Sequence, residues 1–225
     1  MAAHGRPTLR DLFDDSPTPH IAHPPRTHHR HFYVATDGSY RRNGGDGGLG
    51  VVIETRGGTR VARVSLPDVP PNNNVAEYRA LHLGLDVLAA RAPKHARVGV
   101  LVDHDDLAAA INGEVLVDAS GDTGWRPGDG PRIPAGSESH WRGIRARIAG
   151  FAELRAARID SRDNPAHPLA NAPEAYAHVN RSADRCILPD PTDGVDNVTG
   201  PTGADAESAD PQFPPPSRFE GRASD

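Results

Sequence analysis

The sequence contains very little cysteine and no long apolar stretch. Cys186 is the single cysteine among 225 residues, which excludes an internal disulfide framework and a zinc site built from cysteine thiolates. No run approaches the ~20 apolar residues of a membrane-spanning helix, and the first residues, MAAHGRPTLRDLFDD, do not form a signal peptide. These absences predict a cytoplasmic protein with no membrane association.

Aromatic residues are also scarce, at 5%, whereas glycine and proline number 23 and 22. A chain of this composition does not pack over its whole length. Residues 1–30 contain five prolines and no sustained periodicity, and residues 184–225 contain nine acidic residues against three arginines. We therefore expect a disordered N-terminal arm (1–30), one monomeric domain (31–183) and a disordered acidic tail (184–225).

The central segment alternates between strand and helix patterns. Apolar runs predict five strands, with Arg56-Gly57-Gly58 as the turn between the second and third, at 31–37, 49–55, 59–65, 97–103 and 156–160. Apolar residues three and four apart predict a helix over 74–91, and further helices are expected at 105–112, 139–154 and 167–180, the last interrupted by Pro173. Residues 113–139 are expected to form a long loop. This order of elements predicts an α/β sheet with helices on its faces.

Three acidic residues stand where a single site can collect them. Asp37 and Asp103 each end an apolar strand, and Glu77 lies in the first turn of the long helix. Neighbouring strands bring such ends close together, and buried carboxylates without a counter-charge are costly. A converging set therefore indicates cations, and all-oxygen ligation is typical of Mg²⁺ or Mn²⁺ rather than of zinc.

The chain resembles the type 1 ribonuclease H family over about residues 31–181. The resemblance depends on several short motifs in the family's order: Thr36-Asp37-Gly38-Ser39, Asn43-Gly44-Gly45-Asp46-Gly47-Gly48-Leu49-Gly50, Asn73-Asn74-Val75-Ala76-Glu77, Val102-Asp103, Asn164-Pro165-Ala166 and Leu169-Ala170-Asn171. It implies a ribonuclease H-like fold, which is a five-stranded mixed sheet of order 3-2-1-4-5 with helices on both faces.

The same resemblance implies an endonuclease that hydrolyses the RNA strand of RNA–DNA hybrids. Two divalent ions, Mg²⁺ or Mn²⁺, would be shared by Asp37, Glu77 and Asp103, and the products would carry 5′-phosphate and 3′-hydroxyl ends. Asn43, Asn73 and Asn74 match positions that contact the minor groove of the hybrid, and the turn at Gly38 and Ser39 would approach the substrate closely.

The sequence departs from the family at the start of the last helix, where the usual carboxylate is replaced by His167. Imidazole is a softer ligand, better suited to Mn²⁺, and it also transfers protons near neutral pH. We expect His167 to be a ligand and catalytic residue, with a simple helix-start residue as the alternative. A second departure places Arg162 in a loop where many members carry a histidine, which suggests phosphate contact. These departures keep open a second function, a non-catalytic module that binds RNA or hybrids.

Each acidic residue also has a plain structural interpretation. Asp37 and Gly38 are typical of a turn, Asn74 and Glu77 have the spacing of a helix capping pair, and Asp103 or Asp105 would cap the next helix. The ordered set of motifs, rather than any single one, favours the metal site.

Two further surfaces have predicted partners. Arg142 and Arg145 lie three residues apart on a basic helix, so they share a face that would contact nucleic-acid phosphates, unless that face is only solvated. In residues 6–13, Leu9 and Phe13 loosely resemble the peptide that docks on DNA sliding clamps, with an amphipathic stretch as the alternative.

Overall fold

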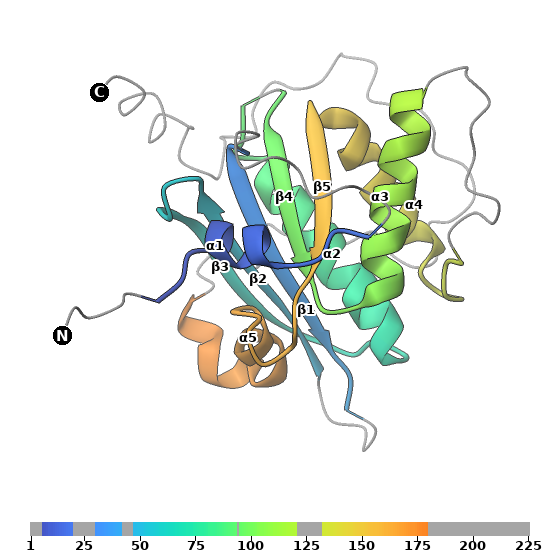
Figure 1. The fold of residues 1–225 in the computed structure, drawn as a ribbon. Helices are drawn as coiled ribbons and strands as arrows, with labels where there is room; N and C mark the ends of the chain where they lie inside the picture. The colour runs from blue at the N-terminus through green and yellow to red at the C-terminus, as the bar shows by residue number, and fades with distance from the viewer. Residues whose placement is uncertain (1–5, 20–29, 42–46, 94, 121–131, 180–225) are drawn as a thin grey trace, which may run out of the picture.

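The computed structural model describes residues 6–19, 30–41, 47–93, 95–120 and 132–179. Five strands form one sheet of order β3-β2-β1-β4-β5, which confirms the predicted order and mixed pairing (Figure 1). The strands are β1 (Phe32–Ser39), β2 (Gly47–Thr55), β3 (Arg60–Asp68), β4 (Arg97–Val102) and β5 (Glu153–Arg158). β1 pairs antiparallel with β2 and parallel with β4, and β4 pairs parallel with β5.

β1 is the central strand, and every one of its residues is buried. The hairpin between β2 and β3 turns at the expected place, with Gly58 at a φ of 77°. Pro67 lies in β3, which is an edge strand, and an edge tolerates a residue without an N–H because one side of the strand pairs with nothing in the sheet.

One face of the sheet is covered by α2 (Asn73–Ala89), α3 (Asp105–Ser120) and α4 (Glu138–Gly150). Their apolar side chains form a single core with alternate residues of the strands, including Val34, Val51, Leu81, Ile111 and Ile144. Trp141 lies in this core, edge-on to Tyr78 with ring centroids 6.1 Å apart, so it is a packing residue.

The opposite face carries a second core, built by α1 (Leu9–Asp15) and α5 (His167–Asn171) (Figure 1). Leu9 and Phe13 are almost fully buried against Tyr33, and Thr8 closes the helix with a capping box to Asp11. The expected disordered arm is therefore wrong for residues 6–19. Their two large apolar side chains, four residues apart, bury themselves on the finished sheet. This burial gives Leu9 and Phe13 a packing role, and the docking of residues 6–13 on a sliding clamp stays a prediction.

The N-terminal segment and α3 also cover the outer edge of β5. The Asn112 side chain exchanges two hydrogen bonds of 2.8 Å with the backbone of Ala156 and donates a third, also 2.8 Å, to the Pro19 carbonyl. The Arg158 N–H donates to the Pro17 carbonyl at 2.9 Å. These contacts satisfy backbone groups that an edge strand otherwise leaves unpaired.

Other boundaries differ from the sequence prediction. α3 continues to Ser120, so the predicted loop at 113–139 is helical over its first eight residues, and the part at 121–131 lies outside the described residues. α4 ends at Gly150 and β5 begins at Glu153, because Glu153 and Leu154 already pair with β4.

The predicted break at Pro173 is confirmed, since α5 ends at Asn171 and a 3₁₀ helix, η2 (Pro173–Val179), follows. The predicted acidic tail lies outside the described residues. Among the helices that the structure describes, none has the length and apolar character to cross a membrane.

Candidate active site

The two aspartates reach one place because their strands are parallel neighbours. Asp37 lies within β1, and Asp103 directly follows β4. The register pairs Ala35 with Leu101, so the residues two further along each strand, Asp37 and Asp103, stand side by side. Asp37 is 2% exposed and belongs to the face of β1 that also presents Tyr33 and Ala35. This face is the one that α5 covers.

Glu77 approaches from the other side of β1. It lies in the first turns of α2, is 2% exposed, and accepts a hydrogen bond of 3.2 Å from the Gly38 N–H at its Oε2. A Cβ on Gly38 would lie 2.2 Å from the Ala76 carbonyl carbon, so only glycine lets the start of α2 touch the strand. The plain interpretation of Glu77 as a capping residue is wrong, because the N-cap is Asn72, whose side chain accepts from the Val75 N–H at 2.9 Å.

α5 supplies the histidine. His167 Nδ1 lies 3.3 Å from Asp37 Oδ2, and one ligand atom from each of Asp37, Asp103 and His167 lies within 4.8 Å of the other two. Glu77 is not part of this compact group, although all four residues were predicted as ligands. Three of the four predicted side chains therefore lie close enough to share one ion, with Glu77 beside them, and their role as ligands stays a prediction.

The loop before α5 holds the histidine in position through Asn164. This buried side chain donates to the Thr36 carbonyl at 2.9 Å and accepts from the Ala166 N–H at 3.0 Å, so it ties the loop to the residue before Asp37. Asn171 then lies 3.1 Å from Nδ1 and 3.0 Å from Nε2 of His167.

α5 itself rests directly on β2. A Cβ on Gly50, the residue paired with Asp37, would lie 2.2 Å from the Ala166 carbonyl oxygen and 2.9 Å from the Ala170 nitrogen. The helix therefore needs a residue without a side chain beneath it.

The pKa values of two carboxyl groups in the site are strongly raised. Burial, followed by the neighbouring charge of Asp103, raises the pKa of Asp37 to about 8. Burial also raises the pKa of Glu77 well above its usual value, with Asp103 and Asp37 adding to the effect. Crowded, desolvated carboxylates of this kind are stabilised by a cation, and the donors here, two carboxylates and an imidazole, fit a divalent metal such as Mn²⁺.

Two residues to which the sequence analysis gave no role support the site. Ser161 donates to Asp103 Oδ2 at 2.7 Å, and Asn171 contacts the His167 ring. Asn171 belongs to a motif of the family resemblance, whereas Ser161 carries no signal in the sequence, because a serine in a loop is common and its partner is 58 residues away.

The residues predicted to bind nucleic acid are in different situations. Asn73 and Asn74 are exposed at the start of α2, near the acidic group, and Asn74 Oδ1 lies 3.3 Å from His104 Nε2. Gly38 and Ser39 are buried, and Ser39 has a structural role because its hydroxyl donates to the Ala170 carbonyl and accepts from the Gly48 N–H. Asn43 lies outside the described residues.

The predicted basic residues are all exposed. Arg142 and Arg145 lie on α4, where Arg145 pairs with Glu114 at 2.6 Å. Arg162 has a side chain that is 83% exposed and lies near Asp160 and Asp163, at 3.5 and 3.8 Å. Asp105, two residues after Asp103, pairs with Arg158 at 3.4 Å.

The profile of the reverse transcriptase-like family matches residues 35–120, which include Asp37, Glu77 and Asp103. A search of the curated proteins found no match.

Among solved structures, the N-terminal RNase H domain of a Mycobacterium tuberculosis protein, fused to maltose binding protein, is 23% identical, with a TM-score of 0.48, and the match covers 62% of this chain and 95% of that one. RNase H1 from Halobacterium salinarum NRC-1 is 21% identical, with a TM-score of 0.49 and coverages of 64% and 97%. The compost metagenome enzyme LC11-RNase H1 is 24% identical, with a TM-score of 0.49 and coverages of 65% and 99%. The family profile covers residues 35–120, and the strand order β3-β2-β1-β4-β5 is that of the predicted ribonuclease H-like fold.

Proposed function

We propose that this protein is a metal-dependent endonuclease that hydrolyses the RNA strand of RNA–DNA hybrids. The observation that carries the proposal is the compact group of Asp37, Asp103 and His167, whose ligand atoms lie within 4.8 Å of one another, with the buried Glu77 carboxylate beside it. The match to the reverse transcriptase-like profile and the ribonuclease H-like strand order make the hybrid the first substrate to test, and LC11-RNase H1 has been solved in complex with an RNA/DNA hybrid.

Asp37, Asp103 and His167 would hold one divalent ion, and Glu77 with Asp37 would hold a second. Bound ions of this kind supply an activated water and stabilise the leaving 3′ oxygen. The protein's own part is to orient the group: Ser161 fixes Asp103, Asn164 anchors the loop before His167, and the Gly38 N–H directs Glu77. The products would carry 5′-phosphate and 3′-hydroxyl ends.

Substrate contact is proposed for exposed groups around this centre. Asn73 and Asn74 offer amides that both donate and accept, which suits the 2′-hydroxyl groups and base edges of a minor groove. Arg142 and Arg162 are exposed cations for backbone phosphates. Arg145 would have to release Glu114 first. The monomeric state and the cytoplasmic location expected from the sequence belong to the same proposal.

The test is hydrolysis of a labelled hybrid, compared in Mg²⁺ and in Mn²⁺. We expect cleavage in at least one ion and a loss of about 10²-fold or more in Asp37→Asn, because that change removes a buried charge at the centre of the group. Asp106→Asn is the matched control, since Asp106 is an exposed aspartate on α3 outside the group, and it should cleave like the wild type.

The second candidate is a binding module without catalysis, which the histidine in place of a carboxylate favours. Fluorescence anisotropy on the same hybrid separates the two. Saturable binding with no cleavage in either ion would overturn the nuclease and support the module. Double-stranded RNA and DNA, run in parallel, test whether the hybrid is the preferred substrate.

A further inference from the structure

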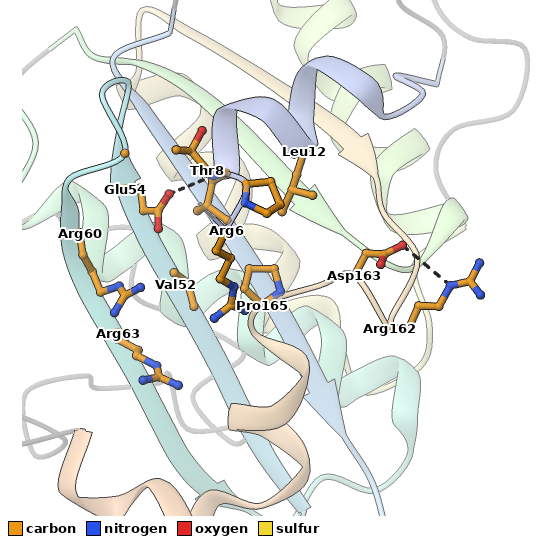
Figure 2. Close-up of a pocket in the computed structure, with 13 residues that line it drawn as sticks. Arg6, Thr8, Leu12, Val52, Glu54, Arg60, Arg63, Arg162, Asp163 and Pro165 are labelled. Carbon is orange, nitrogen blue, oxygen red and sulfur yellow. Dashed lines mark hydrogen bonds and ion pairs between the residues drawn. The ribbon is translucent and has the colours of Figure 1, made fainter. Parts of the chain in front are cut away.

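A second, basic pocket lies between the N-terminal segment and the sheet (Figure 2). Its volume is about 380 Å³. One wall is the segment from Arg6 to Leu12, a second is formed by β2 and β3, and a third is the loop that leads to α5. The lining residues include Arg6, Arg60, Arg63, Arg162, Val52 and Glu54.

Three arginines bring positive charge into this pocket. Arg60 and Arg63 reach from β3 toward Arg6 on the N-terminal segment, whereas Arg162 extends away (Figure 2). Arg63 stacks over the Tyr176 ring at 5.2 Å, which fixes its guanidinium without neutralising it. Among the described residues, no carboxylate lies within ion-pair distance of Arg6, Arg60 or Arg63.

The acidic residues of the pocket are already engaged. Glu54 accepts a hydrogen bond of 2.9 Å from the Leu9 N–H, and Asp163 lies 3.8 Å from Arg162. The contact to Glu54 also attaches the N-terminal segment to β2. Glu54, which lines one wall of the pocket, therefore holds the segment that forms another wall. Three guanidinium groups remain for an anion.

We propose that this pocket binds phosphoryl groups. A guanidinium presents several donors in a plane and matches the oxygens of phosphate better than other side chains do. The apolar wall at Val52 excludes water on one side, which strengthens such contacts. The phosphoryl group belongs either to a small free anion or to a nucleic-acid strand, and both present the same chemistry to the arginines.

The pocket is separate from the acidic group. Both lie on the face of the sheet that α1 and α5 cover, but Val52 pairs with Ala35, two residues before Asp37, and the hairpin end with Gly58 lies further away. Arg162 and Pro165 of the pocket belong to the loop that ends at His167. A strand passing over this loop would contact both places. Phosphoryl binding in the pocket does not depend on the proposed nuclease activity.

The test is isothermal titration of the full chain with inorganic pyrophosphate, with EDTA and without divalent ions. Under these conditions the carboxylates repel the probe, so binding reports the pocket. We expect saturable 1:1 binding and at least a tenfold weaker Kd in the double variant Arg60→Gln/Arg63→Gln, which removes two charge-assisted contacts. Arg56→Gln/Arg97→Gln removes two exposed arginines outside the pocket and should bind as the wild type does.

No saturable binding to the wild-type chain, or equal weakening in both double variants, would overturn the pocket. Thermal unfolding checks that each variant is folded, and the single variant Arg6→Gln repeats the test if the double variant is not. A repeat titration with saturating hybrid present distinguishes the source of the phosphate. Loss of pyrophosphate binding then indicates a strand, and unchanged binding indicates a free anion.

Discussion

At the scale of single residues, the site depends on charges that the protein alone leaves uncompensated. Asp37 and Glu77 are nearly inaccessible to solvent, and both have raised pKa values because burial opposes ionisation. The folded state therefore carries electrostatic strain, because these two carboxylates are buried near the point where two parallel strands end. Such strain indicates a site prepared for a cation.

The pH dependence of stability should reveal this strain. Because the folded pKa of Asp37 is about 8 and the unfolded value is near 3.8, the folded state holds the proton more tightly, and stability falls as the pH rises between these values. An ordinary histidine, with a pKa near 6.5, is mostly neutral above pH 7, so the decrease in melting temperature without divalent ions is best measured from pH 7 to 8.5. One such group contributes at most about 2 kcal/mol over this range.

Mn²⁺ should reduce that slope, because the ion offsets the charge of the ionised carboxylates. Asp37→Asn should flatten it as well, and calorimetry with and without Mn²⁺ measures both effects. A slope that is the same in the wild type and in Asp37→Asn would assign the pH dependence to other groups.

The residue at position 167 should set the ion preference. In His167→Asp we expect hybrid cleavage in Mg²⁺ to be preserved or to increase, because a carboxylate is the harder ligand. The measurement is the ratio of rates in Mg²⁺ and Mn²⁺, with His95→Asp as a control at an exposed histidine outside the compact group. A severe loss in both ions would mean that the imidazole itself takes part in the reaction.

At the scale of elements, two contacts hold the helices to their neighbours through polar groups. Asn112 links α3 to the backbone of β5, and His82 of α2 meets His140 of α4 with their Nδ1 atoms 3.4 Å apart. Both contacts are buried, so each one makes the packing of its helix sensitive to a single substitution.

Asn112→Ala should destabilise the fold by about 2–4 kcal/mol, because it leaves the N–H and the carbonyl of Ala156 without partners in the interior. Urea unfolding measures the loss, and Arg142→Ala, a change at an exposed position of α4, serves as the surface control. A change below about 0.5 kcal/mol in Asn112→Ala would show that water replaces the amide.

The histidine pair should make the protein sensitive to acid. Burial, together with the neighbouring His82, lowers the pKa of His140 to about 4, and burial lowers that of His82 as well. Because the pKa is lowered in the folded state, the stability that the neutral histidines contribute is fully present above their unfolded pKa of about 6.5. This contribution is lost as the pH falls toward 4. His140→Phe should weaken this loss, which melting temperatures at pH 5 and pH 8 measure. Equal losses in variant and wild type would rule out the pair as the cause.

At the scale of the whole molecule, the N-terminal segment is part of the domain. Phe13 is fully buried and lies 5.6 Å from the Tyr33 ring, edge to face, with the Arg30 guanidinium 4.6 Å from its own ring. The domain therefore begins well before the first strand.

Phe13→Ala should lower the free energy of unfolding by about 3–5 kcal/mol, the usual cost of removing a large aromatic side chain from a core. Asp15→Ala, an exposed residue of the same helix, is the control and should change it little. Chemical denaturation gives both numbers. A Phe13→Ala protein as stable as the wild type would show that α1 is only loosely attached.

Deleting residues 190–225, in contrast, should leave hybrid cleavage intact.

Much of this molecule follows from its sequence. β1 to β4 and α2 were predictable because their apolar residues recur regularly, and Asp37 and Asp103 because each follows an apolar run. β5 begins three residues before its predicted start at 156. α1 was not predictable, since its partner surface exists only after β1 has joined the sheet. The alternative that made Asn74 the cap of α2 was wrong, because Asn72, Asn73 and Asn74 are adjacent and only the path of the preceding loop selects one.

Gly50, which has no side chain, allows α5 to pack closely on β2 beside the proposed metal site. Because backbone atoms of Ala166 and Ala170 lie directly against that glycine, the close packing of α5 on β2 helps to place His167 beside Asp37. A larger residue at position 50 would displace α5 from β2. The affinity for an ion would then change although every proposed ligand remained the same.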